Sequence, residues 1–136
     1  MRVETSFIIP VFNAAKHLRA CLESVQQQSK PDFEVILIDD GSTDGSNRIL
    51  AEFATADSRF SVVTQMNTGA AAARNQGLDH TCGTYIALVD ADDVLMPTSL
   101  ERLTSEIHQA DIATCGYSHW HGSVQRPIII QPSGPM

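Results

Sequence analysis

Hydrophobic and polar residues alternate with two different periods along this 136-residue chain. Short apolar runs rich in β-branched residues are typical of buried strands, and they occupy residues 6–11, 34–38, 60–64, 85–89, 112–115 and 124–130. Between them, apolar side chains recur at helical spacing over residues 14–28, 48–56, 69–78 and 98–109. Strands and helices therefore follow one another in turn, which predicts an α/β fold with a Rossmann-like, mostly parallel sheet flanked by helices.

Local sequence signals refine these elements. Asn13 is expected to cap the first helix, and residues 98–101 have capping-box spacing at the start of the last one. Consecutive alanines make the third helix thin, so its backbone is expected to approach the sheet closely. The run at residues 85–89 carries no charge and is expected to be covered on both faces, whereas Pro127 confines the last run to a sheet edge.

Acidic residues directly follow two of the predicted strands. Parallel strands joined by right-handed crossovers send the segments after them to one edge of the sheet, where open α/β sheets place their ligands. Residues 10–13, 39–45, 65–69 and 90–93 should therefore border one crevice. Beside the cation of Arg74, this crevice gathers the carboxylates of Asp39, Asp40, Asp44, Asp90, Asp92 and Asp93.

Such clustered carboxylates favour a bound cation. Unit charges a few ångströms apart repel by roughly several kcal/mol at an effective dielectric constant of about 20, so an uncompensated cluster is costly. Oxygen ligands indicate a hard divalent ion, Mg²⁺ or Mn²⁺. The segment that starts at Asp40 opens like an EF-hand loop, but Ala51 stands where the bidentate glutamate belongs, which argues against calcium.

A purely structural interpretation remains open for three of these segments. Asp44 is either a ligand or the acceptor of an Asx turn or helix cap. The acids of residues 90–93 are either ligands or a cap with surface charge. Residues 67–69 form either an ordinary helix N-terminus or, through free amides and the nearby Arg74, an anion site.

Composition narrows the class of protein. A net charge of −7 argues against nucleic acid or an anionic membrane as the main partner. The cysteines, at positions 21, 82 and 115, are far apart and expected to be reduced. No apolar run reaches the length of a transmembrane helix and no signal peptide is expected, so the default location is the cytoplasm.

The length bounds the number of domains, and one motif near the end stays ambiguous. A chain of 136 residues is expected to form a single domain, residues 1–136. Residues 119–121, His-Trp-His, are either a metal or stacking patch or a partly exposed strand end.

Four motifs stand in order within the α/β pattern. They are residues 6–13 (SFIIPVFN), 35–44 (VILIDDGSTD), 67–69 (NTG) with 73–78 (ARNQGL), and 85–93 (YIALVDADD). Together they resemble the inverting glycosyltransferases of family 2, which have the GT-A fold. The match covers about residues 1–115, and its joint pattern is far more specific than a lone D-x-D. Residues 116–136 are expected to be an edge strand and a tail, cut from a longer chain.

The resemblance implies roles for the matching positions. The loop that cradles the nucleotide corresponds to Pro10, Val11, Phe12 and Asn13. Asp40, with Asp39 beside it, resembles the acid that hydrogen-bonds the uracil of a UDP-sugar. Arg74, in one motif with Asn67 and Gly69, resembles the arginine near the base and phosphates.

The last motif, Asp90-Ala91-Asp92, is similar to the family's D-x-D. The resemblance implies that Asp90 faces the ribose and that Asp92 faces a Mn²⁺ or Mg²⁺ bridging the diphosphate, with Asp93 assisting. The implied activity is transfer of a sugar, with inversion, from a nucleotide-diphospho-sugar to a glycan or lipid-linked acceptor. Bacterial envelope or capsule polysaccharide synthesis is the pathway it suggests.

An inverting reaction also needs a base on the acceptor hydroxyl, and in the family that base lies in the carboxyl-terminal half. From position 111 onward the only carboxylate here is Asp111, expected on the opposite edge of the sheet, so no catalytic base is assigned. The chain is expected to bind donor, with weak or absent transfer. The full-length protein is expected in the cytoplasm or at the inner face of the membrane, and the open edge of a truncated sheet favours self-association.

Other classes of protein fit parts of the pattern. A sugar nucleotidyltransferase would need a glycine- and basic-rich loop after the first strand, where residues 11–15 read VFNAA. A haloacid-dehalogenase-like phosphatase would carry its Asp-x-Asp after the first strand and a downstream lysine, but lysines occur only at positions 16 and 30. A non-catalytic nucleotide-sugar-binding module is the remaining alternative.

Overall fold

One sheet of four parallel strands, in the order β3-β2-β1-β4, forms the middle of the molecule. The computed structural model describes residues 2–116, with strands at Thr5–Val11 (β1), Phe33–Asp39 (β2), Phe60–Thr64 (β3) and Tyr85–Leu88 (β4). The helices are Ala15–Gln26 (α1), Ser46–Ala56 (α2), Ala70–Leu78 (α3) and Ser99–Glu106 (α4), followed by a 3-10 turn at Ile107–Gln109 (η1). The predicted α/β fold is confirmed.

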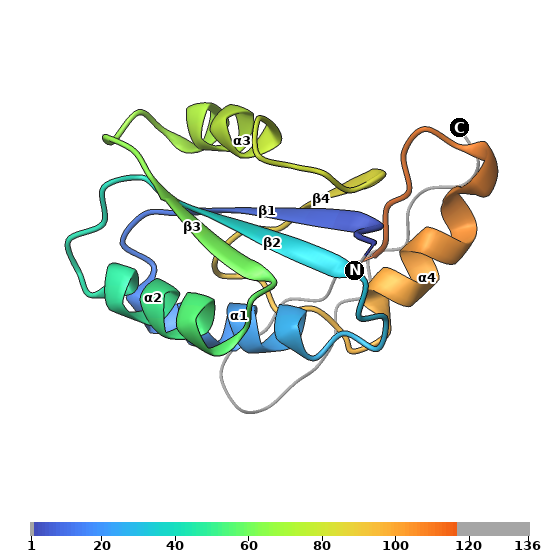
Figure 1. The fold of residues 1–136 in the computed structure, drawn as a ribbon, viewed down its shortest axis with the longest axis horizontal. Helices are drawn as coiled ribbons and strands as arrows, with labels where there is room; N and C mark the ends of the chain where they lie inside the picture. The colour runs from blue at the N-terminus through green and yellow to red at the C-terminus, as the bar shows by residue number, and fades with distance from the viewer. Residues whose placement is uncertain (1, 117–136) are drawn as a thin grey trace.

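The helices cover the two faces of the sheet unequally. Figure 1 shows α1 and α2 together on one face and α3 on the other, with α4 beside one end of the sheet. The chain moves outward from β1 through β2 to β3, and then returns by α3 to place β4 on the other side of β1. The strand order therefore reverses between β1 and β4, and open α/β sheets bind ligands at such a reversal.

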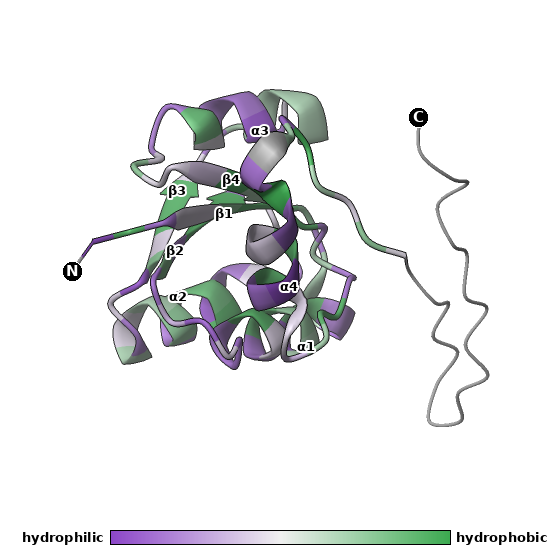
Figure 2. Cartoon of the chain, turned by 90° about the vertical axis from the view of Figure 1, so that its right-hand side faces the viewer, coloured by the Kyte–Doolittle hydropathy of each residue, from purple (hydrophilic) through white to green (hydrophobic). Residues whose placement is uncertain are grey.

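The main hydrophobic core lies between the sheet and the pair α1 and α2. Alternate residues of β1 point into it and meet the apolar stripe of α1, with Phe7, Ile9, Val11, Leu18, Leu22 and Val25 all buried. Figure 2 shows the green, apolar sides of α1 and α2 turned toward the strands. This core fixes where the carboxyl end of β1 lies, and so where the loop after it begins.

The opposite face carries a smaller cluster under α3. Ile36 and Ile38 of β2 pack there with Ala73. Gly77 of α3 lies against β1, since a Cβ added to it would stand 2.5 Å from Ile8 Cγ2. The prediction of a thin, alanine-rich helix lying close to the sheet is therefore confirmed.

β4 differs from the prediction that it would be covered on both faces. Ile86 is 40% exposed and Leu88 is 61% exposed. Both lie on the α3 side of the sheet, since they pair in register with Ser6 and Ile8. Because α3 packs over β1 and β2, it leaves that face of β4 open.

The structure also corrects the predicted ends of α1 and α4. Ala14, not Asn13, is the N-cap of α1, because Asn13 adopts a left-handed conformation with φ of 47°. Thr98 is the N-cap of α4, but its side chain makes no capping hydrogen bond. Glu101, the partner that a capping box requires, instead accepts a hydrogen bond from the Ser29 hydroxyl at 2.9 Å.

Two further expectations concern the end of the chain. The strand predicted at residues 112–115 is wrong, since these residues follow η1 without regular secondary structure. The strand predicted at 124–130 and the motif at 119–121 lie outside the described residues. Within residues 2–116, no helix is both long and apolar enough to cross a bilayer.

An ion pair joins the end of α2 to the start of β3. The Arg59 guanidinium donates to both carboxylate oxygens of Asp57, at 2.8 Å from Nη2 to Oδ2 and 3.1 Å from Nε to Oδ1. It also stacks 4.2 Å from the centre of the Phe33 ring. The hydrogen bond from Arg59 lowers the pKa of Asp57 from 3.8 to about 2.

This lowered pKa predicts a loss of stability in acid. Asp57 binds its proton more weakly in the folded chain than in the unfolded one, so the stabilisation is fully present above about pH 4 and is lost as the pH falls toward about 2. We expect about 1–2 kcal/mol, allowing for solvent screening. Urea unfolding between these pH values should show a smaller decrease for Asp57→Asn than for the unchanged chain; equal decreases would contradict the assignment.

Candidate functional site

The loops that follow β1 and β2 are joined by hydrogen bonds. The Thr43 amide donates to Asn13 Oδ1 at 2.8 Å, and the Asn13 amide donates to the Ser42 hydroxyl at 3.0 Å. One residue further on, the Ala14 amide donates to the Ser46 hydroxyl at 3.0 Å. Asparagine tolerates a positive φ better than most residues do. In this conformation both the backbone amide and the side-chain oxygen of Asn13 face the loop after β2.

Asp40 joins the loop after β2 to the loop after β3. Its Oδ1 accepts from the Gln65 side chain at 2.8 Å and from the Thr68 amide at 2.9 Å, and its Oδ2 accepts from the Gly69 amide at 2.9 Å. These bonds, that from Gln65 first, lower the pKa of Asp40. The amides of residues 68 and 69 were one candidate for an anion site, and the anion they bind is the Asp40 carboxylate.

Asp39 and Asp44 also accept hydrogen bonds within the loop after β2. Asp39, which is buried, accepts the Ser42 amide at 3.0 Å. Asp44 accepts the Ser46 amide at 3.0 Å and the Ser46 hydroxyl at 2.6 Å, which is the Asx turn considered from the sequence. The bond from that hydroxyl is the main reason that the pKa of Asp44 is lowered. Both acids therefore order the loop itself.

A turn after β4 presents the remaining acids. The Asp93 amide donates to the Asp90 carbonyl at 3.0 Å and closes the turn. One carboxylate oxygen from each of Asp90, Asp92 and Asp93 lies within 4.8 Å of the others, and all three residues are exposed. Desolvation and the nearby charges of Asp90 and Asp92 raise the pKa of Asp93. We refer to residues 90–93 as the acidic turn.

Arg74 lies beside the acidic turn. From α3 its guanidinium donates to Asp90 Oδ1 at 3.0 Å, with both side chains partly exposed. A single exposed cation compensates little of the repulsion among three carboxylates. The donor set, which is all oxygen and close together, fits a hard divalent cation.

The other residues singled out from the sequence border these loops. Pro10 and Val11 end β1, and Phe12 projects from the next position with 48% of its surface exposed. A Cβ added to Gly41 would stand 3.4 Å from the backbone nitrogen of Asn67, so the loops after β2 and β3 meet there. Ala91, between the acids, is buried in the main core.

Sequence reasoning missed two residues that support the site. Gln65 holds Asp40, and Cys21 of α1 donates its thiol to the Asp90 carbonyl at 3.5 Å. Burial, reinforced by the charges of Asp93, Asp92 and Asp90, raises the pKa of Cys21 to about 12. Cys21 lies in the helix predicted at residues 14–28, but no sequence signal identified its partner in the segment after β4.

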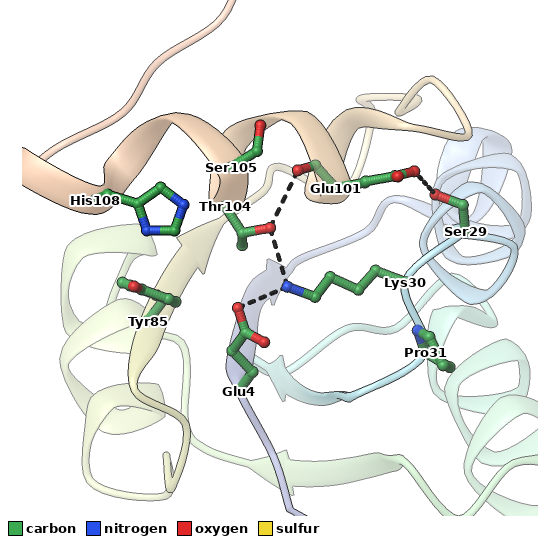
Figure 3. Close-up of a pocket in the computed structure, with 9 residues that line it drawn as sticks. All are labelled: Glu4, Ser29, Lys30, Pro31, Tyr85, Glu101, Thr104, Ser105 and His108. Atoms are coloured by element: carbon green, nitrogen blue, oxygen red, sulfur yellow. Dashed lines mark hydrogen bonds and ion pairs between the residues drawn. The ribbon is translucent and has the colours of Figure 1, made fainter.

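A hollow of about 490 Å³ lies at the opposite edge of the sheet. Figure 3 shows Lys30 at its centre, paired with Glu4 and hydrogen-bonded to Thr104. Glu4 directly precedes β1 and Tyr85 begins β4, whereas the acidic turn follows the other end of β4. η1 contributes His108 to this hollow, and Asp111 follows two residues after η1 ends.

An open parallel sheet with three linked loops and an acidic turn at its strand reversal is the arrangement of a Rossmann-like α/β domain with a candidate site at the carboxyl ends of its strands. The model of the family described as "Glycosyl transferase family 2" matches residues 6–128. The chain belongs to this family. It is 40% identical over 118 residues to glycosyltransferase GlyA of Streptococcus pneumoniae and 39% identical over 114 residues to the uncharacterized glycosyltransferase EpsJ of Bacillus subtilis.

These relatives are much longer proteins. The matches cover 85% and 82% of this chain but only 17% of GlyA and 33% of EpsJ. Among solved structures, residues 1–349 of S. aureus TarS superimpose with a TM-score of 0.72 and 28% identity, over 77% of this chain and 32% of that one. A TarS structure in complex with UDP-GlcNAc superimposes with a TM-score of 0.68 and 26% identity, over 77% of this chain and 31% of that one. The GT-A fold is therefore confirmed.

Proposed function

We propose that this chain is the donor-binding part of an inverting glycosyltransferase that takes its sugar from a UDP-sugar. The observation that carries the proposal is the acidic turn: its three carboxylates converge at the strand reversal beside Arg74, in a chain of this family. Support for the nucleotide comes from TarS, a relative in fold and sequence whose structure was solved with UDP-GlcNAc.

The acidic turn fits a divalent metal. Asp92 and Asp93 would hold Mn²⁺ or Mg²⁺ there, because both are exposed and neither pairs with Arg74. When bound, such an ion neutralises the charge that grows on a departing diphosphate and acts as a Lewis acid. Without it, an acidic crevice would repel a diphosphate.

The remaining loops supply the nucleotide contacts in this proposal. Phe12, exposed at the end of β1, offers an apolar surface next to the strand reversal. Asp40 is buried, with Oδ1 accepting two hydrogen bonds and Oδ2 one; in this proposal Oδ2 accepts an N–H of the base as its second bond. Arg74 can exchange its exposed bond to Asp90 for a phosphate oxygen, while Asp90 turns to the ribose.

Transfer itself needs a base and an acceptor surface that we assign to other parts of a longer protein. The acceptor in this proposal is a glycan or lipid-linked sugar. Within residues 2–116 the carboxylates of the site either order the loops or belong to the acidic turn, so none is assigned as the base on an acceptor hydroxyl. We therefore propose donor binding for this chain, with weak or absent transfer.

Self-association of the isolated chain is also part of this proposal. Among residues 2–116 no strand pairs with the outer edge of β4, and Ile86 and Leu88 are exposed next to it. Light scattering at rising concentration should show an increase in mass for the unchanged chain. Leu88→Lys, which places a charge beside that edge, should keep the chain monomeric; a strictly monomeric unchanged chain would contradict the proposal.

Thermal unfolding of the 136-residue chain tests donor binding directly. We expect UDP at about 100 times its dissociation constant, with Mn²⁺ present, to stabilise the fold by about 2.7 kcal/mol and raise Tm by on the order of 10 °C. Either component alone should give a much smaller rise. If no nucleoside diphosphate moves Tm with Mn²⁺ present, this chain is not a working donor site, although it remains a member of the family.

A further inference from the structure

The segment that contains the acidic turn has no regular structure of its own. Between β4 and α4, residues 89–98 form turns and irregular backbone. Apolar side chains attach this segment to the main core: Val89 and Ala91 are buried in it, and Leu95 packs against it. Side chains that alternate between core and solvent cannot by themselves fix a turn, because the backbone groups between them also need partners.

Polar side chains of α1, and of one residue just beyond its end, supply these partners. Cys21 and Ser24 lie three residues apart in α1, and Gln28 lies two residues after the helix ends. We call them the polar row of α1. The Cys21 thiol donates to the Asp90 carbonyl at 3.5 Å, and the Leu95 amide donates to the Ser24 hydroxyl at 3.0 Å. The Asp90 carbonyl is the same atom that closes the acidic turn.

Gln28 completes the row at the far end of the segment. It is 6% exposed, and its amide nitrogen donates to the Met96 carbonyl at 2.8 Å while its oxygen accepts the Leu100 amide at 2.9 Å. The same nitrogen donates to the Ser24 carbonyl at 3.0 Å, and the Ser24 hydroxyl donates to the Cys21 carbonyl at 2.6 Å. The three side chains therefore form one connected set of bonds, not three separate ones.

We propose that the polar row of α1 positions the acidic turn for the metal and nucleotide, so that Cys21, Ser24 and Gln28 are positioning residues of the donor site. The inference rests on the proposed function. Because a buried polar group without a partner is costly, the row holds three backbone groups of the segment, those of Asp90, Leu95 and Met96, at defined distances from α1. Losing one bond lets the carboxylates of Asp90 and Asp92 drift apart.

The substitution Ser24→Ala tests the row, with Ser6→Ala as a matched control. Ser6 is buried near the start of β1, at the end of the sheet away from the acidic turn, and its hydroxyl accepts the Gly83 amide at 2.8 Å. Both substitutions remove one hydroxyl that accepts one backbone amide. Measured by electron paramagnetic resonance with UDP present, Mn²⁺ should bind Ser24→Ala about tenfold more weakly than the unchanged chain. Ser6→Ala should keep the unchanged affinity, and Ser24→Thr, which keeps a hydroxyl, should restore most of it.

A second readout needs no ligand. Hydrogen exchange of the Asp93 amide, which closes the turn but bonds to no residue of the row, should be about tenfold faster in Ser24→Ala and unchanged in Ser6→Ala. If the unchanged chain binds Mn²⁺ with UDP and Ser24→Ala binds it equally well, the positioning role is wrong. If the unchanged chain does not bind but the Asp93 amide responds as expected, the proposed function fails while the ordering of the turn stands. If neither responds, both are overturned.

Discussion

Replacing Asp92 with alanine should remove the stabilisation that UDP and Mn²⁺ together give this chain. The metal would lose one of three carboxylates that lie within 4.8 Å of one another, and Asp90 is already engaged by Arg74. The rise in Tm, on the order of 10 °C for the unchanged chain, should fall to about the level seen with either component alone. Without ligand, Tm should stay the same or increase slightly, because one like charge has left the acidic turn.

Asp92→Ala should lower Tm in the presence of UDP and Mn²⁺ but not in their absence, and this difference distinguishes a metal-binding residue from one that only supports the fold. A residue that only supported the fold would lower Tm in the absence of ligand. Asp79→Ala is the matched control, since Asp79 is an exposed acid at the end of α3 and its loss changes the net charge equally. This control should keep the full rise with UDP and Mn²⁺. A full rise in Asp92→Ala as well would show that the acidic turn does not bind the metal.

Phe7→Ala should be among the most destabilising single substitutions in the chain. Phe7 is 2% exposed in the main core and meets Phe33 edge-on, with ring centres 5.4 Å apart. Removing a buried phenylalanine ring costs about 3–5 kcal/mol, through lost burial and the cavity left behind. Urea unfolding should show this as a lower midpoint with an unchanged slope.

Phe12→Ala is the same substitution a few residues later, and it should act in the opposite manner. Phe12 is 48% exposed and follows the end of β1, so its loss should change the free energy of unfolding by less than about 0.5 kcal/mol. It should instead reduce the rise in Tm that UDP gives with Mn²⁺. Equal destabilisation by both substitutions would mean that the loop after β1 packs differently from the structure described.

Much of the fold was predictable because burial sets the hydrophobic pattern. The predicted strand at 60–64 matches β3, β1 and β4 differ from their predictions by one residue at one end, and β2 differs by one residue at each end. The cover on β4 was not predictable, since it depends on where a helix of nine residues comes to lie. A charge-free run shows that a strand can be buried, not that a neighbour reaches it.

The site divides in the same manner. The parallel connection of the strands was enough to bring the loops to one edge and to place Arg74 near the acids. The partners of individual side chains were not predictable, because they come from distant positions. Asn13 was expected to cap its own helix, but the Thr43 amide takes its oxygen; Asp40 accepts amides from residues 68 and 69. A side chain that could bond to its own helix bonds instead to a residue far away in the sequence, and a local sequence motif does not show where that residue lies.

The hydrogen bonds that join the loops after β1, β2 and β3 have one more consequence. Asn13 connects the first loop to the second, and Asp40 connects the second to the third, so the three loops form one cross-linked surface. A loop that is free before binding loses conformational entropy when a ligand orders it, and that loss weakens affinity. Here the loops are already ordered in the folded chain, so a ligand that binds to this surface should cost them little further conformational entropy.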